Sequence, residues 1–85
     1  MLLLTQEHCS LCERASRVLE RLAADYPLQV TTLELASKQG RALAERGGIL
    51  FAPGVFLDGE RFSYGRLSER KLRRELHRRR SARTG

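Results

Sequence analysis

The chain has 85 residues, of which 41% are hydrophobic and 31% are charged. This length allows one small domain with a single core, and the composition excludes an intrinsically disordered protein. The apolar start, residues 1–4, is too short for the core of a signal peptide, and no long apolar run follows it. We therefore expect a cytoplasmic protein that does not enter a membrane, in a compartment where disulfides are rarely permanent.

The net charge of +6 is concentrated near the C-terminus. Residues 66–85 contain nine Lys or Arg and two Glu, whereas the first 65 residues carry seven basic and eight acidic side chains. Such a basic segment is usually a solvated helix face that keeps a small protein soluble. It is also the pattern of a surface that docks nucleic acid or an acidic partner. We favour the solvated face and do not expect nucleic acid to bind.

The first half of the chain alternates between strand and helix patterns. Residues 1–5 form a short apolar run that is compatible with a buried strand. From Ser10 onward, apolar side chains recur three and four positions apart, which predicts an amphipathic helix that ends before Tyr26-Pro27. Residues 28–35 are β-branched and partly alternating, which indicates a second strand. Ser37 is the expected N-cap of a second helix over residues 37–46, which Gly47-Gly48 closes.

The second half reads as a hairpin followed by a helix. Asp58-Gly59 lies between residues 55–57 and 60–63, and this dipeptide between apolar runs predicts a β-hairpin turn. Tyr64-Gly65 breaks the chain, and Ser68 caps a last helix that is expected to end near residue 79. The order β-α-β-α-β-β-α predicts an α/β fold with a mixed four-stranded sheet and helices on both faces. We expect one domain over residues 1–80 and a frayed basic tail over 81–85.

All the cysteine of the chain lies in one pair, Cys9 and Cys12. A zinc site needs four ligands, and the only histidines are His8, adjacent to Cys9, and the distant His77. A phosphatase-like Cys-x5-Arg loop fails because Arg14 comes one residue too early. An incidental pair is a further alternative, since cysteine often behaves as a small buried hydrophobe.

The context of the pair favours thiol chemistry. Cys9 follows the first predicted strand and stands at the start of the first predicted helix, where free backbone N–H groups and the helix dipole stabilise a thiolate. Cys12 lies one helical turn away on the same side, within reach to close a disulfide ring with Cys9. The pattern therefore predicts a redox-active Cys-x-x-Cys pair and no metal site.

Together these motifs resemble the glutaredoxin-like branch of the thioredoxin superfamily, over roughly residues 1–78. The resemblance rests on Cys9-Ser10-Leu11-Cys12 after the first strand, on Ala52-Pro53 before the hairpin, and on Asp58-Gly59 followed by Gly65. It implies a thioredoxin-like fold, with Cys9 as the nucleophile and Cys12 as the resolving thiol. It also implies a cis Pro53 facing the cysteines, which leaves the backbone of Ala52 free to pair with an extended substrate.

The chain departs from the family where glutathione would bind. Glutathione-using members usually carry a lysine three residues before the first cysteine, where this chain has Gln6, and an aromatic residue where it has Leu11. They also follow the hairpin with Gly-Gly and polar or acidic residues, whereas this chain has Gly65-Arg66. Arg66 offers no carboxylate to a substrate ammonium, although it could hold a carboxylate. Tyr64 and Gly65 border the expected groove, or form only a helix-entry turn, and Gly65 and Arg66 are the expected substrate-binding residues of this loop.

The resemblance implies a dithiol oxidoreductase that reduces protein or low-molecular-weight disulfides. We expect no bound cofactor, and glutathione or another small thiol is the candidate reductant. The expected partners are disulfide-containing proteins or small thiols, and we expect a monomer. The alternative is a non-catalytic adaptor module on the same fold that docks a partner or nucleic acid through its basic last helix. An adaptor has no need for both thiols, so we favour the enzyme.

Overall fold

The computed structural model describes the backbone of residues 1–84 and the side chains of residues 1–80. Over that part of the chain the elements follow in the order β1 (Leu2–Thr5), α1 (Ser10–Ala23), β2 (Thr31–Glu34), α2 (Lys38–Gly47), β3 (Gly54–Leu57), β4 (Glu60–Tyr64) and α3 (Glu69–Thr84). The predicted β-α-β-α-β-β-α order is confirmed.

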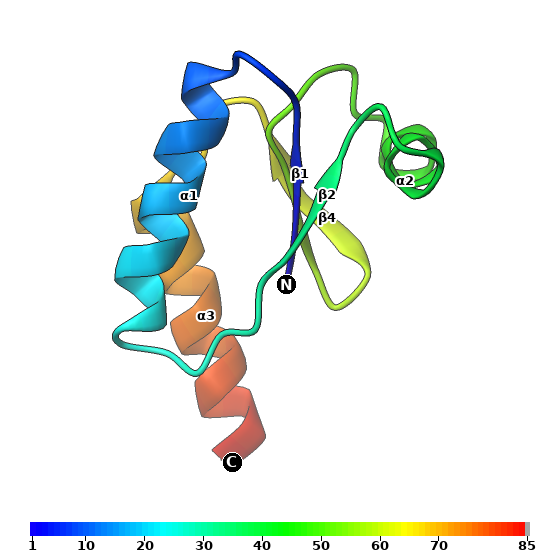
Figure 1. The fold of residues 1–85 in the computed structure, drawn as a ribbon. Coiled ribbons are helices and arrows are strands. Elements are labelled where there is room, and N and C mark those ends of the chain that lie inside the picture. The colour runs from blue at the N-terminus through cyan, green and yellow to red at the C-terminus, as the bar shows by residue number, and fades with distance from the viewer. Residues whose placement is uncertain (85) are drawn as a thin grey trace.

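The four strands form one mixed sheet in the order β2-β1-β3-β4. Strand β1 pairs in parallel with β2 and antiparallel with β3, and β3 and β4 form the antiparallel hairpin around Asp58-Gly59. Helices α1 and α3 lie side by side on one face of the sheet and α2 lies on the other (Figure 1). The fold class is therefore the thioredoxin-like α/β arrangement that the sequence predicts.

Two apolar clusters fill the space between the sheet and its helices. Adjacent residues of a strand point to opposite faces, so the buried Leu3 packs under α1 and α3 while the buried Leu4 packs under α2. Helix α1 contributes half of the buried residues of the first cluster, Ala15, Val18, Leu19 and Leu22, and α3 contributes Leu72. No helix among the described residues is long and apolar enough to cross a membrane.

Two boundaries differ from the sequence expectation by three residues or more, and the others by one or two. Strand β2 begins at Thr31 instead of residue 28, because the N–H of Leu28 donates to the carbonyl of Tyr26 in a turn and not to a strand. Helix α3 extends to Thr84, past the end expected near Arg79, so residues 81–84 of the segment assigned to a frayed tail continue the helix. Arginine and alanine there favour helix. Gly85, the end of that segment, lies outside the described residues.

Three loops meet at one end of the molecule. The β1–α1 loop, the α2–β3 loop and the β4–α3 loop all lie at the top of Figure 1, where α1 begins. Helix α3 starts at this end and runs away from it, so the C-terminal part of α3 lies at the opposite end of the domain (Figure 1). The candidate site is built by these three loops.

Candidate active site

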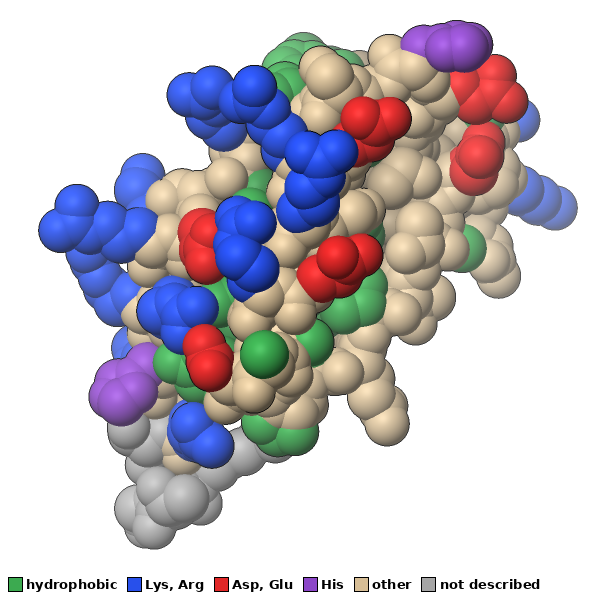
Figure 2. All heavy atoms as spheres, turned by 60° about the vertical axis from the view of Figure 1, so that its left-hand side comes forward, with side chains coloured by type: hydrophobic (Ala, Val, Ile, Leu, Met, Phe, Trp, Pro, Cys, Tyr) green, Lys and Arg blue, Asp and Glu red, His purple; other side chains and the backbone are tan. Residues whose placement is uncertain are grey.

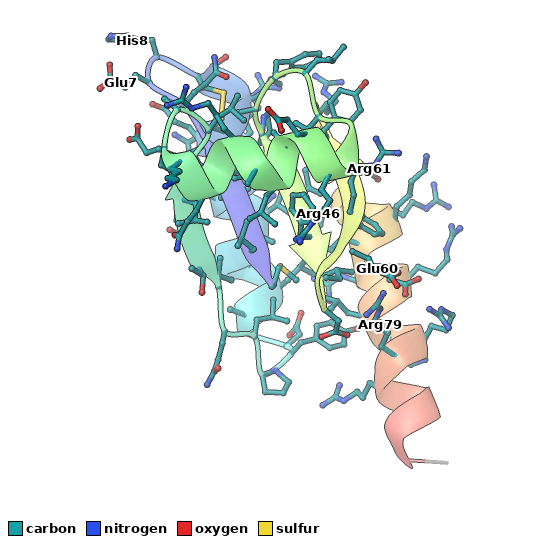
Figure 3. All side chains as sticks on the ribbon, turned by 90° about the vertical axis from the view of Figure 1, so that its right-hand side faces the viewer. Glu7, His8, Arg46, Glu60, Arg61 and Arg79 are labelled. Atoms are coloured by element: carbon teal, nitrogen blue, oxygen red, sulfur yellow. A yellow bond between two sulfur atoms is a disulfide. The ribbon has the colours of Figure 1, made fainter. Side chains whose placement is uncertain are left out.

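Cys9 and Cys12 form a disulfide at the start of α1. Their Cα atoms are 5.2 Å apart, inside the usual range for a disulfide. Cys9 is the N-cap of the helix, and its Sγ accepts a hydrogen bond from the backbone N–H of Cys12 at 3.1 Å. A donor aimed at this sulfur stabilises negative charge on it when the disulfide opens. Figure 3 shows the disulfide at the end of the domain where Glu7 and His8 project outward.

The two sulfurs differ in how far they are buried. Cys12 is only 5% exposed and faces the core, whereas Cys9 is only partly buried at the tip of the helix. The His8 backbone, with φ of 52°, lies in the left-handed region and turns the chain sharply from the loop into the helix. An incoming molecule therefore reaches Cys9 before it reaches Cys12.

The α2–β3 loop places a cis peptide bond against the disulfide. The Ala52–Pro53 bond is cis, and the carbonyl oxygen of Ala52 lies 3.9 Å from the Sγ of Cys9. The backbone N–H of Ala52 donates to the side-chain Oε1 of Gln6 at 3.2 Å. The expectation that the whole backbone of Ala52 is free for a substrate is therefore wrong in part, because a side chain from the β1–α1 loop already accepts from its N–H.

The β4–α3 loop closes the site from the third side. The backbone N–H of Gly65 donates to the carbonyl of Pro53 at 2.8 Å, which ties this loop to the cis-proline segment. Gly65 has a φ of 81°, which favours glycine, and a Cβ there would lie 3.5 Å from the ring of Phe51. Gly65 thus lies beside the cis-proline segment, and Arg66 follows it on the surface.

One rim of the site is apolar and exposed. Leu50 is 81% exposed and Phe51 is 49% exposed, and both directly precede the cis-proline segment. The Phe51 ring packs edge-to-face on Tyr64, with the ring centroids 5.3 Å apart. The guanidinium of Arg61 lies over the Tyr64 ring, 5.5 Å from its centroid. Large apolar side chains left open beside a reactive sulfur can contact a docked molecule.

The other rim is a basic groove of about 250 Å³ between α1 and the β4–α3 loop. Its lining residues are Leu11, Arg14, Arg17, Val18, Arg21, Arg66 and Leu67, and we call this the arginine groove. Leu11 lies between the two cysteines, so the groove begins at the disulfide. Figure 2 shows Lys and Arg side chains gathered on the face that carries α1 and α3, with acidic side chains among them.

The structure brings the six residues singled out from the sequence to one end of the domain: Cys9, Cys12, Ala52, Pro53, Gly65 and Arg66. Sequence reasoning missed the contact of Gln6 with Ala52, the exposed Phe51, and the grouping of Arg14 and Arg17 with Arg66. The spacing of Arg14, Arg17 and Arg21 along one helix was the available signal for the groove.

Comparison with known proteins agrees with this geometry at the level of the family. No curated protein matches the chain. The family model described as Glutaredoxin-like domain (DUF836) matches residues 1–77, which include the disulfide, the cis-proline segment, the hairpin and most of α3. A match over nearly the whole chain shows the family, and the coarse function that it indicates is thiol redox chemistry. The chain belongs to the glutaredoxin-like domain family.

Proposed function

We propose that this protein is a dithiol oxidoreductase that reduces disulfides of proteins or of small thiols. The observation that carries the proposal is the unequal burial of the two sulfurs beside the cis-proline segment. An accessible sulfur with a backbone N–H donor is suited to attack, and a buried sulfur one turn away is suited to resolve the product.

The reaction has two exchange steps. The Cys9 thiolate attacks one sulfur of the substrate disulfide, a mixed disulfide forms, and the other substrate sulfur leaves as a thiolate that takes a proton from water. The Cys12 thiolate then attacks the Sγ of Cys9, which forms the Cys9–Cys12 disulfide and releases the second substrate thiol. The substrate gains two electrons and the protein loses two. A dithiol, or two molecules of glutathione or another small thiol, returns them.

The proposed role of the cis-proline segment is to hold the substrate. The Ala52 carbonyl faces Cys9, so an extended chain that donates to this oxygen would run past the attacking sulfur. Pro53 fixes the bend of the segment, and Gly65 supports it through its hydrogen bond to the carbonyl of Pro53. Arg66 lines the arginine groove, where it is placed to attract a carboxylate.

The direct test is a single-turnover assay with pre-reduced protein and two substrates, insulin and hydroxyethyl disulfide. We expect the wild type to reduce both, Cys9→Ser to reduce neither, and Cys12→Ser to accumulate a mixed disulfide that mass spectrometry detects. Cys12→Ser is the matched control, because it also removes one thiol from the same helical turn. A Cys9→Ser variant as fast as wild type would show that Cys9 is not the attacking group.

The adaptor alternative stays a prediction. In α3, Arg78 and Arg79 bind Glu75, and Arg79 also binds Asp58 of the hairpin turn. This part of the basic helix is therefore engaged within the domain, at the end opposite the disulfide (Figure 1). Charge reversal of Arg78-Arg79-Arg80 should leave disulfide reduction unchanged if the protein is the proposed enzyme.

A further inference from the structure

We infer that the arginine groove binds an acidic segment of the polypeptide whose disulfide reaches Cys9. This inference rests on the proposed function and names its substrate class: proteins or peptides with Asp or Glu residues near the target cystine.

The first argument is position. The groove starts at Leu11, between the two cysteines, and follows one face of α1 as far as Arg21. Any chain lying in it passes directly from the groove to the disulfide.

The second argument is uncompensated charge. Arg21 at the far end of the groove donates two hydrogen bonds to Glu69, at 3.1 and 2.7 Å. Arg14, Arg17 and Arg66, by contrast, have no hydrogen-bond or ion-pair partner among the described residues. All three are exposed and line the groove, and Arg14 lies two positions after Cys12. Guanidinium groups that face one groove without carboxylates attract an anionic ligand.

The third argument is size. Leu11 and Arg21 are ten positions apart, so at about 1.5 Å rise per residue the groove follows about 15 Å of helix. An extended chain rises about 3.3 Å per residue, so about four to five residues of a peptide match this length. The groove is therefore longer than the two or three residues of a small thiol, and it suits a polypeptide segment.

The fourth argument is the mixture of side chains around the site. Leu11, Val18 and Leu67 lie among the arginines of the groove, and Leu50 and Phe51 are exposed on the opposite rim. A polypeptide offers carboxylates to one rim and apolar side chains to the other, and it brings a disulfide to the sulfur between them. A nucleic acid supplies the negative charge but no disulfide.

The test uses two peptides with one internal disulfide each, flanked by Asp and Glu in one and by Asn and Gln in the other. The pre-reduced protein is mixed with each peptide at low salt, and the single-turnover rate constant is measured. We expect the acidic peptide to react about tenfold faster, since several exposed charge pairs each contribute modestly and steer the encounter. This preference should fall to less than about twofold at 0.5 M salt.

Two double variants locate the preference. Arg14→Gln/Arg17→Gln should lose it, whereas Arg41→Gln/Arg46→Gln should keep it. The second variant is a matched control, because it removes two exposed arginines from α2 on the opposite face of the sheet, where Figure 3 shows Arg46. Circular dichroism checks that both variants fold. Equal rates for the two peptides, or a preference that survives Arg14→Gln/Arg17→Gln, would overturn the inference.

A binding measurement separates this inference from the proposed function. In a Cys9→Ser/Cys12→Ser variant no exchange occurs, so fluorescence anisotropy of the labelled peptides reports the groove alone. If no disulfide is reduced by the wild type but the acidic peptide still binds through Arg14 and Arg17, the enzyme proposal fails and the groove stands. A single-stranded oligonucleotide that binds more tightly than the acidic peptide would contradict a polypeptide occupant. So would a reduction rate of glutathione disulfide that depends on these arginines while the two peptides react at equal rates.

Discussion

The two helices on the same face of the sheet are held there in different ways. Helix α1 buries Cys12, Ala15, Val18, Leu19 and Leu22, whereas α3 buries Leu72 and packs Leu76 partly against the same cluster. Helix α3 is instead tied to its surroundings by ion pairs, through Arg21–Glu69 to α1, Arg73–Asp25 to the turn after α1, and Arg79–Asp58 to the hairpin. Apolar contact thus positions the helix that carries the disulfide, whereas the helix that does not carry it combines a smaller apolar contact with exposed ion pairs.

The same difference explains where the free positive charge lies. The sequence is most basic at the C-terminus, but Arg73, Arg78 and Arg79 of α3 are engaged with carboxylates. Helix α1 belongs to the part of the chain with nearly balanced charge, yet its Arg14 and Arg17 have no carboxylate partner among the described residues and lie near the disulfide. Positive charge that is available near the site therefore comes from α1 as well as from Arg66, the first residue of the basic C-terminal segment.

The largest expected effect on stability comes from removing an apolar side chain through which α1 packs on the core. Leu22→Ala removes a fully buried side chain and should lower the free energy of unfolding by about 3 kcal/mol, as for other large-to-small changes in cores. Leu76→Ala is the comparison in α3, and because Leu76, unlike Leu72, is only partly buried, it should cost about 1 kcal/mol. Urea denaturation of both variants measures the difference. Equal losses would mean that α3 depends on apolar burial as much as α1 does.

The N-termini of the two helices offer a smaller contrast. The Oγ of Ser68 accepts from the N–H of Lys71 at 3.2 Å, and the Sγ of Cys9 does the same for Cys12 in α1. Ser68→Ala should lower the free energy of unfolding by about 1 kcal/mol, the usual effect of losing an N-cap. Its exchange rate with hydroxyethyl disulfide should stay at the wild-type value, because only the cap of α1 is a reacting group. A slower reaction would show that the start of α3 influences the structure of the disulfide site.

Much of the fold follows from local patterns in the sequence. The spacing of Leu11, Ala15 and Leu22 predicted α1, Asp58-Gly59 predicted the hairpin, and the order of elements predicted the mixed sheet. The sequence predicts an end of α3 near residue 79, which is too early. The last residues of the helix favour helix by propensity but include few apolar side chains, so they show no amphipathic pattern. The start of β2 depends on a turn at Tyr26 that strand propensity does not encode.

The candidate site was predictable only where a motif carries it. The cysteines lie three positions apart and Ala52 and Pro53 are adjacent, so both form short local motifs that can be recognised in the sequence. The contact between Gln6 and Ala52 joins positions 46 residues apart, and the meeting of Arg66 with Arg14 and Arg17 depends on how the β4–α3 loop packs beside α1. Exposed polar side chains have no periodic pattern that reports such long-range neighbours, so these features appear only in three dimensions.

The loop before α1 contacts the cis-proline segment through a side-chain hydrogen bond, whereas the loop before α3 contacts it through a backbone hydrogen bond. Gln6 accepts from the N–H of Ala52, and the N–H of Gly65 donates to Pro53. Gln6→Ala frees the N–H of Ala52 for a substrate backbone, so KM for a peptide disulfide should fall by about threefold, in keeping with one net hydrogen bond. Hydroxyethyl disulfide, which has no peptide backbone, is the control and should be unaffected. A rise in KM for both substrates would mean that Gln6 supports the segment and does not compete with the substrate.

The smallest effect concerns the charge pairs of α3 and depends on pH. Hydrogen bonds from Arg78 and Arg79 lower the pKa of Glu75 from its ordinary 4.5 to about 2. Because the folded-state pKa is the lower one, the stabilisation is fully present at neutral pH and is lost as pH falls from about 4.5 toward about 2. The melting temperature of Glu75→Gln should thus lie slightly below that of wild type at pH 7 and converge with it in this acid range.

Glu20→Gln in α1 is the matched control for this pH dependence. Glu20 is exposed and has no ion-pair partner among the described residues. The melting temperature of the Glu20→Gln variant should therefore follow that of wild type across the acid range. High salt should also narrow the gap between Glu75→Gln and wild type at pH 7, because exposed pairs are screened. If Glu20→Gln and Glu75→Gln respond alike to acid, the ion pairs of Glu75 within α3 add no measurable stability.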